Sequence, residues 1–367
     1  MIWQRYWPGA VFALAAVAVS LQRLVLEKHR VFLLYRQAFY DLLAGRNLYA
    51  DRSAEYLDYF RYSPTVALAF GPFAVLPIPL GLLLWNTLNA LALYAALRAL
   101  LPEKQARVAQ LVVLADLVRQ MQSSQMNALL AALMIAACLA YAAGRLWRGA
   151  FAVAAGGFAK IFPASAGLFA LLSNRPLRAL TLLALVCLVF LLLPAPFIGL
   201  SELIQQYQWW RQIGPGQQKP WFSLMDALNV WTGFDWPVLP VQLAGLALLL
   251  APVAIRRDAW TEDGFRRLLL CSLLVFCVLF NHRAETPSYV IAMTGVGIWF
   301  AAGPRDRVAW MVLVLALLLN TVATSDLAPK TLREGTLEPL RVKVIPLIVA
   351  WGVMQAQLLG YRRATDS

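Results

Sequence analysis

Long apolar runs alternate with short polar segments along almost the whole chain. The runs are about 15–22 residues long, and a helix of ~20 apolar residues crosses a bilayer. Because hydrocarbon offers no water, the backbone of such a run must bond to itself, as it does in a helix. There is no alternating strand pattern of the kind that forms a membrane barrel. The pattern therefore predicts an all-α polytopic membrane protein with about 12 transmembrane helices, near residues 8–22, 64–78, 80–101, 106–119, 126–143, 149–172, 179–199, 238–255, 267–281, 288–302, 308–324 and 343–360.

The composition agrees with this class. Of the 367 residues, 61% are hydrophobic and 14% are charged, whereas roughly a quarter are charged in soluble domains. The net charge of +13 does not indicate a nucleic-acid partner, because the basic residues lie in short loops, where membrane topology places them. The first apolar run lacks a convincing small-residue cleavage site, so we expect an uncleaved signal-anchor helix among the membrane lipids.

Neither a metal site nor a nucleotide cofactor is indicated. There is no Walker motif or G-x-G-x-x-G, and no segment has room for a soluble nucleotide-binding domain. We expect no cofactor, although the sequence leaves open whether a divalent cation is needed. A sugar transferase of this form would have to take its donor from the lipid phase. The four cysteines lie in apolar runs without disulfide or metal spacing: Cys138, Cys187, Cys271 and Cys277.

The segment 23–63 is too long for a plain connector. Its apolar and aromatic residues recur at helical spacing and its charged residues fill the other face, which predicts an amphipathic helix in the membrane interface. A shorter acidic segment follows, with Asp51, Glu55 and Asp58. The apolar face consists of Phe32, Tyr35, Phe39, Leu42 and Leu43.

Two further long loops, 200–237 and 325–342, complete a single integral-membrane domain spanning 1–367. Basic clusters at 175–178, 256–267, 305–307 and 362–363 define one side, which the positive-inside rule assigns to the cytoplasm. The loops 200–237 and 325–342 and the turn 280–289 then face the opposite side of the membrane, as does the segment 23–63 if Arg5 stays on the cytoplasmic side.

The apolar run 149–172 carries Lys160 and Pro163 in its middle. Proline frees a backbone carbonyl, and a lysine in hydrocarbon is costly. The run is therefore expected to form a broken or re-entrant helix whose turn reaches a polar cavity.

The turn 280–289 gathers His282, Arg283 and Glu285 between two apolar runs. One interpretation is an interfacial turn with snorkelling charges and an Arg–Glu pair. The other is a site in which Arg283 and His282 bind a phosphate, since the guanidinium fork suits phosphate oxygens, while Glu285 acts as a base or orients a sugar hydroxyl.

Other polar residues are weaker candidates. Gln125 and Asn127 lie at the mouth of a span, where their amides can bind sugar hydroxyls or simply form a polar turn. Lys160 either neutralises a lipid phosphate or snorkels to the interface. Three further candidates are acidic residues of a kind that most often lies on a solvated face: Asp41, Asp58 and Asp326.

Several motifs in one order resemble glycosyltransferase family 87, of the GT-C superfamily of integral-membrane transferases. The resemblance covers nearly the whole chain and rests on the collinearity of LLAGRNLY, FRYSPTVALAFGPFAVLP, WNTLNALALY, QSSQMNALLAALMIAA, AGGFAKIFPA and NHRAETPSY. It implies a polyprenyl-phosphate sugar donor, commonly mannose, and a lipid or glycan acceptor. It also implies a bacterial inner-membrane location, with the active site facing the periplasm or outer leaflet.

The resemblance also implies site residues. The family's usual aspartate, the presumed base, corresponds to Val31, while its Gly-Gln-x-Asn pattern becomes Ser124–Asn127 without the glycine. Its Lys-x-x-Pro element is present, and its late His/Glu segment corresponds to His282 and Glu285.

With Val31 in the base position, we expect Glu285 as base or acceptor-orienting group and His282 as its partner. Asp41 or Asp58 is the alternative base. Arg283 and Lys160 are expected on the phosphate, with further substrate contacts from Gln125, Asn127 and Asp326.

Two other functions remain open. Val31 leaves room for a non-catalytic scaffold or a protein that binds lipid-linked glycans. The lysine in the broken helix suggests a transporter or flippase, but such proteins show paired halves with matching broken helices, and this sequence has none.

Overall fold

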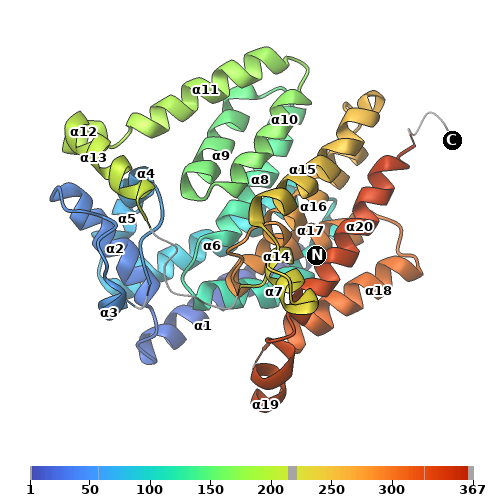
Figure 1. The fold of residues 1–367 in the computed structure, drawn as a ribbon, viewed down its shortest axis with the longest axis horizontal. Coiled ribbons are helices and arrows are strands. Elements are labelled where there is room, and N and C mark those ends of the chain that lie inside the picture. Colours follow the sequence, from blue (N-terminus) through green and yellow to red (C-terminus); the bar gives the residue numbers. More distant parts are fainter. Residues whose placement is uncertain (1, 57, 214–220, 326, 363–367) are drawn as a thin grey trace.

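The computed structural model describes residues 2–56, 58–213, 221–325 and 327–362, and the side chains of all of these except 2–6 and 53. The described residues form helices and connections without a strand, which confirms the all-α class (Figure 1). The first half contains α1 (Ile2–Val25), α2 (Arg30–Leu43), α3 (Ser53–Tyr56), α4 (Pro64–Ala69), α5 (Gly71–Ala74), α6 (Ile78–Leu100), α7 (Glu103–Gln122), α8 (Asn127–Ala142), α9 (Leu146–Ala159), η1 (Phe162–Gly167), α10 (Leu168–Leu171) and α11 (Pro176–Leu192). The second half contains α12 (Ala195–Ile198), α13 (Leu200–Arg211), α14 (Leu224–Thr232), α15 (Val238–Ile255), η2 (Arg257–Ala259), α16 (Asp263–Leu279), η3 (Thr286–Ser288), α17 (Tyr289–Ala302), α18 (Arg307–Ala316), η4 (Leu317–Val322), α19 (Lys330–Leu332), η5 (Arg333–Leu337), η6 (Val342–Val344) and α20 (Ile345–Leu359).

Helices α8, α16 and α17 form the centre of the molecule. Most of their residues are buried, and they pack against α6, α7 and α20. Small residues allow this close approach, as is usual where helices pack in membranes. At Gly149 of α9, for example, an added Cβ would lie 2.8 Å from the ring of Tyr141 in α8.

Five helical segments of the described residues are long and apolar enough to cross a membrane: Trp7–Val25, Ile78–Leu100, Pro176–Ile198, Val238–Ile255 and Val342–Leu359. The predicted number of about 12 transmembrane helices is therefore not confirmed. Several of the predicted spans form shorter apolar helices, among them Asn127–Ala142 and Thr286–Ala302. These short helices are buried among their neighbours, so the apolar character that suggested full spans also reflects a protein core.

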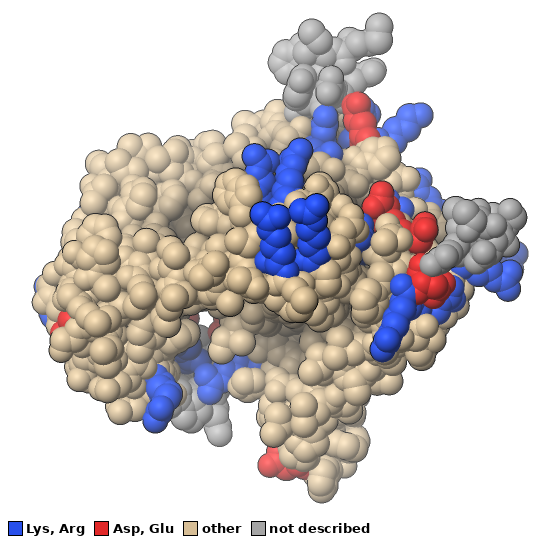
Figure 2. All heavy atoms as spheres, turned by 90° about the horizontal axis from the view of Figure 1, so that it is seen from above, with Lys and Arg blue, Asp and Glu red and all other residues tan. Residues whose placement is uncertain are grey.

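The surface agrees with a membrane protein. Very little of Pro176–Ile198 is buried inside the protein although it is strongly apolar, as expected of a helix that faces lipid. Figure 2 shows one face on which wide areas carry no charged side chain, while lysines and arginines gather in a few groups.

The long loops are built of short helices that lie on one another. The predicted apolar face of α2 packs on α4 and α5, with Phe32, Tyr35 and Leu42 buried, Phe39 partly buried and Leu43 exposed. The loop 325–342 contacts the loop 200–237, because the indole N–H of Trp231 donates to the carbonyl of Leu340 at 2.7 Å. Arg341 also pairs with Asp226.

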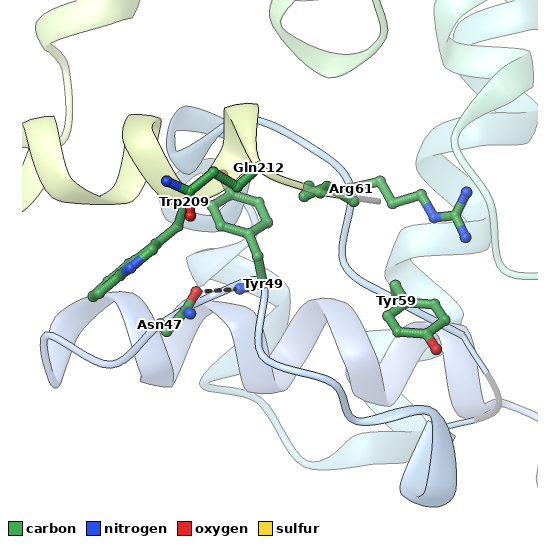
Figure 3. A pocket seen from close by; sticks show the side chains of 7 residues that line it. Asn47, Tyr49, Tyr59, Arg61, Trp209 and Gln212 are labelled. Carbon is green, nitrogen blue, oxygen red and sulfur yellow. Dashed lines mark hydrogen bonds between the residues drawn. The ribbon is translucent and has the colours of Figure 1, made fainter. Parts of the chain in front are cut away.

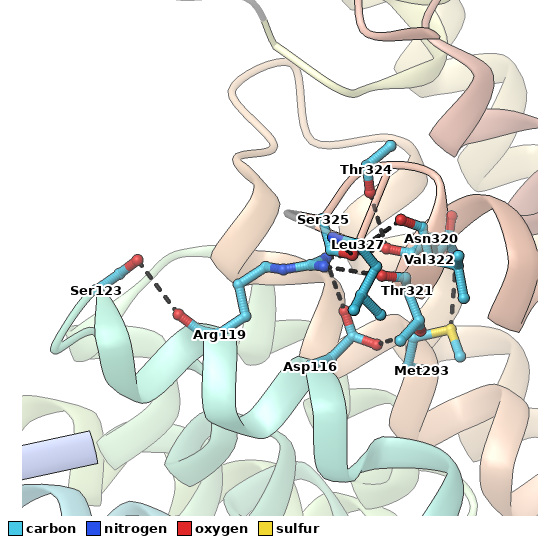
Figure 4. A network of polar contacts seen from close by, with 10 residues as sticks. All are labelled: Asp116, Arg119, Ser123, Met293, Asn320, Thr321, Val322, Thr324, Ser325 and Leu327. Atoms are coloured by element: carbon cyan, nitrogen blue, oxygen red, sulfur yellow. Dashed lines mark hydrogen bonds and ion pairs between the residues drawn. The ribbon is translucent and has the colours of Figure 1, made fainter. Parts of the chain in front are cut away.

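A polar network joins α7 to the C-terminal quarter of the chain (Figure 4). Arg119 donates to the carbonyls of Asn320 and Thr321 at 2.9 and 3.1 Å, and its guanidinium lies 3.6 Å from Asp116. The accepting residues lie in η4, a π-helical turn, whose wider ring leaves backbone groups in need of partners. The network therefore fixes η4 against the helix that leads into the loop 123–126.

Candidate functional site

A cavity of about 870 Å³ opens where several distant parts of the chain meet. Its walls come from residues 58–62, the loop 123–126, the break after α9, the end of α13, α15 and the turn 280–288. The structure thus brings parts of the first two long loops together with the turn 280–289. Irregular backbone and ionisable side chains are tolerated at membrane depth around such a cavity.

Four polar side chains form a connected cluster, of which Gln125, Lys160 and Glu285 line the cavity, whereas Asn127 is fully buried and does not. The Gln125 amide donates from Nε2 to Oε2 of Glu285 at 2.7 Å. Its Oε1 accepts from Nδ2 of Asn127 at 2.8 Å and from Nζ of Lys160 at 3.4 Å. The Lys160 ammonium also donates to Oδ1 of Asn127 at 2.8 Å. Four of the residues predicted to form the site therefore contact one another in the fold.

The break between α9 and η1 places Lys160 at the cavity. Helix α9 ends at Ala159, and Lys160 follows in an extended conformation, with φ −147° and ψ 146°. Residue Pro163 then lies in the first turn of η1, a position where a proline's missing N–H costs no hydrogen bond. The predicted broken helix is confirmed, and its turn reaches a polar cavity.

The loop 123–126 is held in a strained conformation. Ser124 has a φ of 51°, in the left-handed region that non-glycine residues seldom adopt. Its carbonyl accepts from the indole N–H of Trp85 at 2.9 Å, and the next carbonyl, of Gln125, accepts from the amide of Gln120. These two bonds fix the loop and with it the direction of the Gln125 side chain. In the family's Gly-Gln-x-Asn pattern the glycine would have indicated this left-handed turn. Because Ser124 stands in its place, the turn could not be predicted from the sequence.

Cations outnumber carboxylates at the cavity. Arg283 and Lys160 were predicted, whereas Arg61 and Arg211 were not; all four line it, with Glu285 and Asp58 as the carboxylates. Burial lowers the pKa of the Arg283 guanidinium, and the positive charge of Arg61 lowers it further. Both guanidinium groups line the same cavity, and a bound polyanion would relieve the repulsion between them.

His282 lies at the mouth of the same cavity, exposed on one side. Desolvation lowers the pKa of its imidazole, and the adjacent Arg283 lowers it further. The ring is therefore neutral at pH 7 and becomes a cation only in more acidic solution.

The opposite wall is apolar. Helix α15 contributes Leu239, Leu243 and Leu246, which follow one another at helical spacing and are all exposed. The ring of Phe280 occupies the space that a Cβ on Gly245 would need, so α15 packs close to the end of α16. The cavity consequently joins a charged end to an apolar side.

Not every predicted site residue lies at the cavity. Asp41 is 2% exposed and binds the guanidinium of Arg52 at 2.6 Å, away from the cavity lining. Val31 is half-buried in the first turn of α2 and does not line the cavity. Asp326 lies outside the described residues. The roles predicted for these residues stay untested by the geometry.

The arrangement suits the transfer of a group from an anionic lipid. Arginine and lysine bind phosphate oxygens strongly, and an apolar wall can hold a lipid chain. The carboxylate of Glu285, which accepts a hydrogen bond from the Gln125 amide, can take a proton from a substrate hydroxyl. Among the described residues, no group of three or more His, Cys, Asp or Glu side chains is arranged to hold a metal ion.

Comparison with known protein families gives one match. The model described as glycosyltransferase family 87 matches residues 60–280, which is more than half of the chain. The matched region includes Arg61, Gln125 and Lys160, and the turn with His282 and Glu285 begins at its end. A comparison with curated proteins finds none that matches.

Proposed function

The chain belongs to glycosyltransferase family 87, and on that premise we propose that it transfers a hexose, mannose first among the candidates, from a polyprenyl-phosphate donor to a lipid or glycan acceptor. That it is a membrane protein with glycosyltransferase activity follows from the family and the apolar helices. The nature of the donor is the part that we infer from the cavity.

One observation carries the proposal: a single cavity joins a cationic end to an exposed apolar wall. Arg61, Arg283 and Lys160 are placed to neutralise a phosphate. The leucines of α15 offer a long apolar surface on the lipid side, against which a polyprenyl chain can lie. A water-soluble nucleotide sugar has no use for such a wall, whereas a lipid-linked sugar needs both parts.

The reaction needs one base and a stabilised leaving group. In a single displacement, Glu285 takes the proton of an acceptor hydroxyl, and the freed oxygen attacks the anomeric carbon. The bond from that carbon to the phosphate oxygen breaks, and its electron pair stays on the polyprenyl phosphate. The cations stabilise the charge that develops there. Asp58, the other carboxylate at the cavity, is the alternative base.

The polar cluster supports Glu285 in this role. Gln125 orients its carboxylate, and Lys160, hydrogen-bonded to the same Gln125, lies within electrostatic reach of both Glu285 and Asp58. A base held in this way needs little rearrangement when the acceptor arrives. The remaining hydrogen-bonding capacity of the Gln125 amide suits a sugar hydroxyl, whereas Asn127 is fully buried and supports Gln125 from outside the cavity lining.

We further propose that the protein lies in a bacterial inner membrane with the cavity open to the periplasmic leaflet. The basic clusters at 175–178, 256–267 and 305–307 support this orientation through the positive-inside rule. In that leaflet a lipid-linked donor reaches the cavity by lateral diffusion.

The test is incubation of the purified protein with a panel of polyprenyl-phosphate hexoses, beginning with mannose, and a membrane lipid extract. Release of polyprenyl phosphate together with a glycosylated product supports the proposal. Release from none of the donors, in a protein that unfolds cooperatively, contradicts it.

The residue Val31 favours a second candidate, a non-catalytic protein that binds or transports lipid-linked glycans. In the family resemblance this position carries the presumed base. Tight binding of a donor without turnover across the panel would support this second function.

A further inference from the structure

A second hollow, the side hollow, lies between the first long loop and the end of α13 (Figure 3). Its volume is about 360 Å³, within the range of small-molecule sites. Tyr59 and Arg61 line both this hollow and the main cavity, so the two share a wall. Its remaining lining residues are Asn47, Tyr49, Trp209, Gln212 and Ile213.

The lining combines aromatic rings with amides. Tyr49, Tyr59 and Trp209 offer electron-rich faces, which attract the slightly positive C–H groups on one side of a pyranose ring. Asn47 and Gln212 offer both donors and acceptors, which match hydroxyl groups. Among the described residues, no carboxylate lines the hollow, so the described lining does not favour a cationic ligand.

Several polar atoms of the side hollow have no partner in the part of the chain that the structure describes. The indole N–H of Trp209 and the side-chain amide of Gln212 make no hydrogen bond among the described residues. Both groups are therefore available to a polar ligand in the side hollow, which can bind them without displacing another side chain.

Other contacts hold the lining in place. Oδ1 of Asn47 accepts from the backbone N–H of Tyr49 at 2.9 Å, and the hydroxyl of Tyr49 donates to the carbonyl of Tyr62 at 3.0 Å. The backbone of Arg61 accepts from the indole of Trp210 at 3.0 Å, which ties the first long loop to α13. The hollow is thus a built feature and not a chance gap between loops.

We propose that the side hollow binds a neutral hexopyranose unit of the acceptor, an inference that rests on the proposed transfer reaction. The shared wall of Tyr59 and Arg61 places this sugar beside the donor phosphate. The acceptor is therefore a glycan or glycolipid, with at least one sugar already attached, and not a bare lipid.

The experiment uses the full-length protein in lipid nanodiscs, which avoids glycoside detergents that would compete. Saturation-transfer difference NMR is recorded with millimolar methyl hexopyranosides of the manno, gluco and galacto series. The variants are Trp209→Ala, the conservative Trp209→Phe, and Glu285→Gln in the main cavity. Trp147→Ala, at an exposed tryptophan of α9, is the matched control.

The wild type and Trp147→Ala are expected to saturate the ring protons of at least one methyl glycoside. Trp209→Ala should weaken binding about 3- to 10-fold, the value of one aromatic contact, and Trp209→Phe should restore most of it. Glu285→Gln should leave the signal unchanged, because the sugar lies in the side hollow.

Two results would overturn the inference: no saturation of any glycoside by the wild type, or a signal that Glu285→Gln abolishes and Trp209→Ala does not. The measurement needs no donor lipid. A failure to release polyprenyl phosphate would therefore count against the proposed function alone, and a failure here against the side hollow alone.

Discussion

Gln125 and Glu285 stand 160 residues apart in the chain, and Nε2 of Gln125 donates a hydrogen bond to Oε2 of Glu285 at 2.7 Å. This bond joins the loop after α7 to the turn after α16. It orients the carboxylate that we propose as the base, and the same amide binds Asn127 and Lys160. The Gln125 side chain therefore connects the polar residues of this part of the cavity through hydrogen bonds.

The first prediction concerns Gln125 as a positioning residue. In Gln125→Leu the carboxylate of Glu285 loses its donor, and a hydrogen bond to a charged group contributes about 1.5–3 kcal/mol. We expect kcat for polyprenyl-phosphate release to fall about 10- to 100-fold, while the donor KM changes little. Gln208→Leu, at an exposed position of α13, is the control. A rise in KM with unchanged kcat would show that Gln125 binds the donor instead.

The second prediction concerns the arginines that the phosphate is expected to contact. Arg61→Ala and Arg283→Ala should each raise the donor KM about 10-fold, because each removes one charge-assisted contact. In the double variant the donor KM should rise by less than the product of the two single increases. The reason is that removal of either arginine also removes its electrostatic repulsion of the other.

The matched control for the arginine series is Arg178→Ala, which removes an exposed arginine outside the cavity lining. Steady-state kinetics with polyprenyl-phosphate mannose supply the comparison. If Arg178→Ala and Arg61→Ala raised the donor KM equally, the effect would come from the overall positive charge of the protein and not from a direct contact with the phosphate.

The third prediction is a pH dependence carried by His282. Its pKa is lowered from the usual value near 6.5, so the imidazole is neutral at pH 7 and takes a proton only as the pH falls below about 6.5. The new charge joins Arg283 and Arg61 and strengthens phosphate binding. The donor KM should therefore fall between pH 7 and pH 5.5 in the wild type. In His282→Asn the KM should stay flat over this window; a matching fall in both proteins would assign the effect to another group.

The fourth prediction concerns the network around Arg119. In Arg119→Ala the carbonyl of Thr321 loses its guanidinium donor, the carbonyl of Asn320 keeps only the Thr324 hydroxyl, and Asp116 loses a nearby cation. Buried groups left in this state cost about 1–3 kcal/mol each, so the apparent Tm in detergent should drop by several degrees. Arg98→Ala, on α6, tests whether loss of any helix-end arginine has the same effect. An unchanged Tm in Arg119→Ala would mean that η4 is fixed by its apolar contacts alone.

The sequence predicted the all-helical class and the break at Lys160 because both depend on local chemistry. An apolar run in a membrane must be helical, and a lysine followed by proline cannot continue such a helix through hydrocarbon. The number of spans was harder to predict. The composition of α8 and α17 is as apolar as that of α15, yet the first two are short and buried while α15 is exposed. Only packing separates these cases.

The site was predicted in part for the same reason. His282, Arg283 and Glu285 adjoin in sequence, and Gln125, Asn127 and Lys160 stand out against apolar surroundings. Arg61 was missed because a basic residue directly before an apolar run is equally typical of membrane topology. The link from Gln125 to Glu285, and the shared wall between the cavity and the side hollow, exist only in the folded chain.

The most direct test of the central claim, that the cavity around Glu285 and Lys160 is where the sugar leaves its lipid phosphate, is the rate of polyprenyl-phosphate release by Glu285→Gln. Removal of a general base costs about 10²- to 10⁴-fold, and the amide keeps the size of the side chain. We predict a loss in that range at an unchanged Tm, with wild-type release by Glu55→Gln, whose carboxylate lies outside the cavity lining. Release by Glu285→Gln at the wild-type rate would contradict the account.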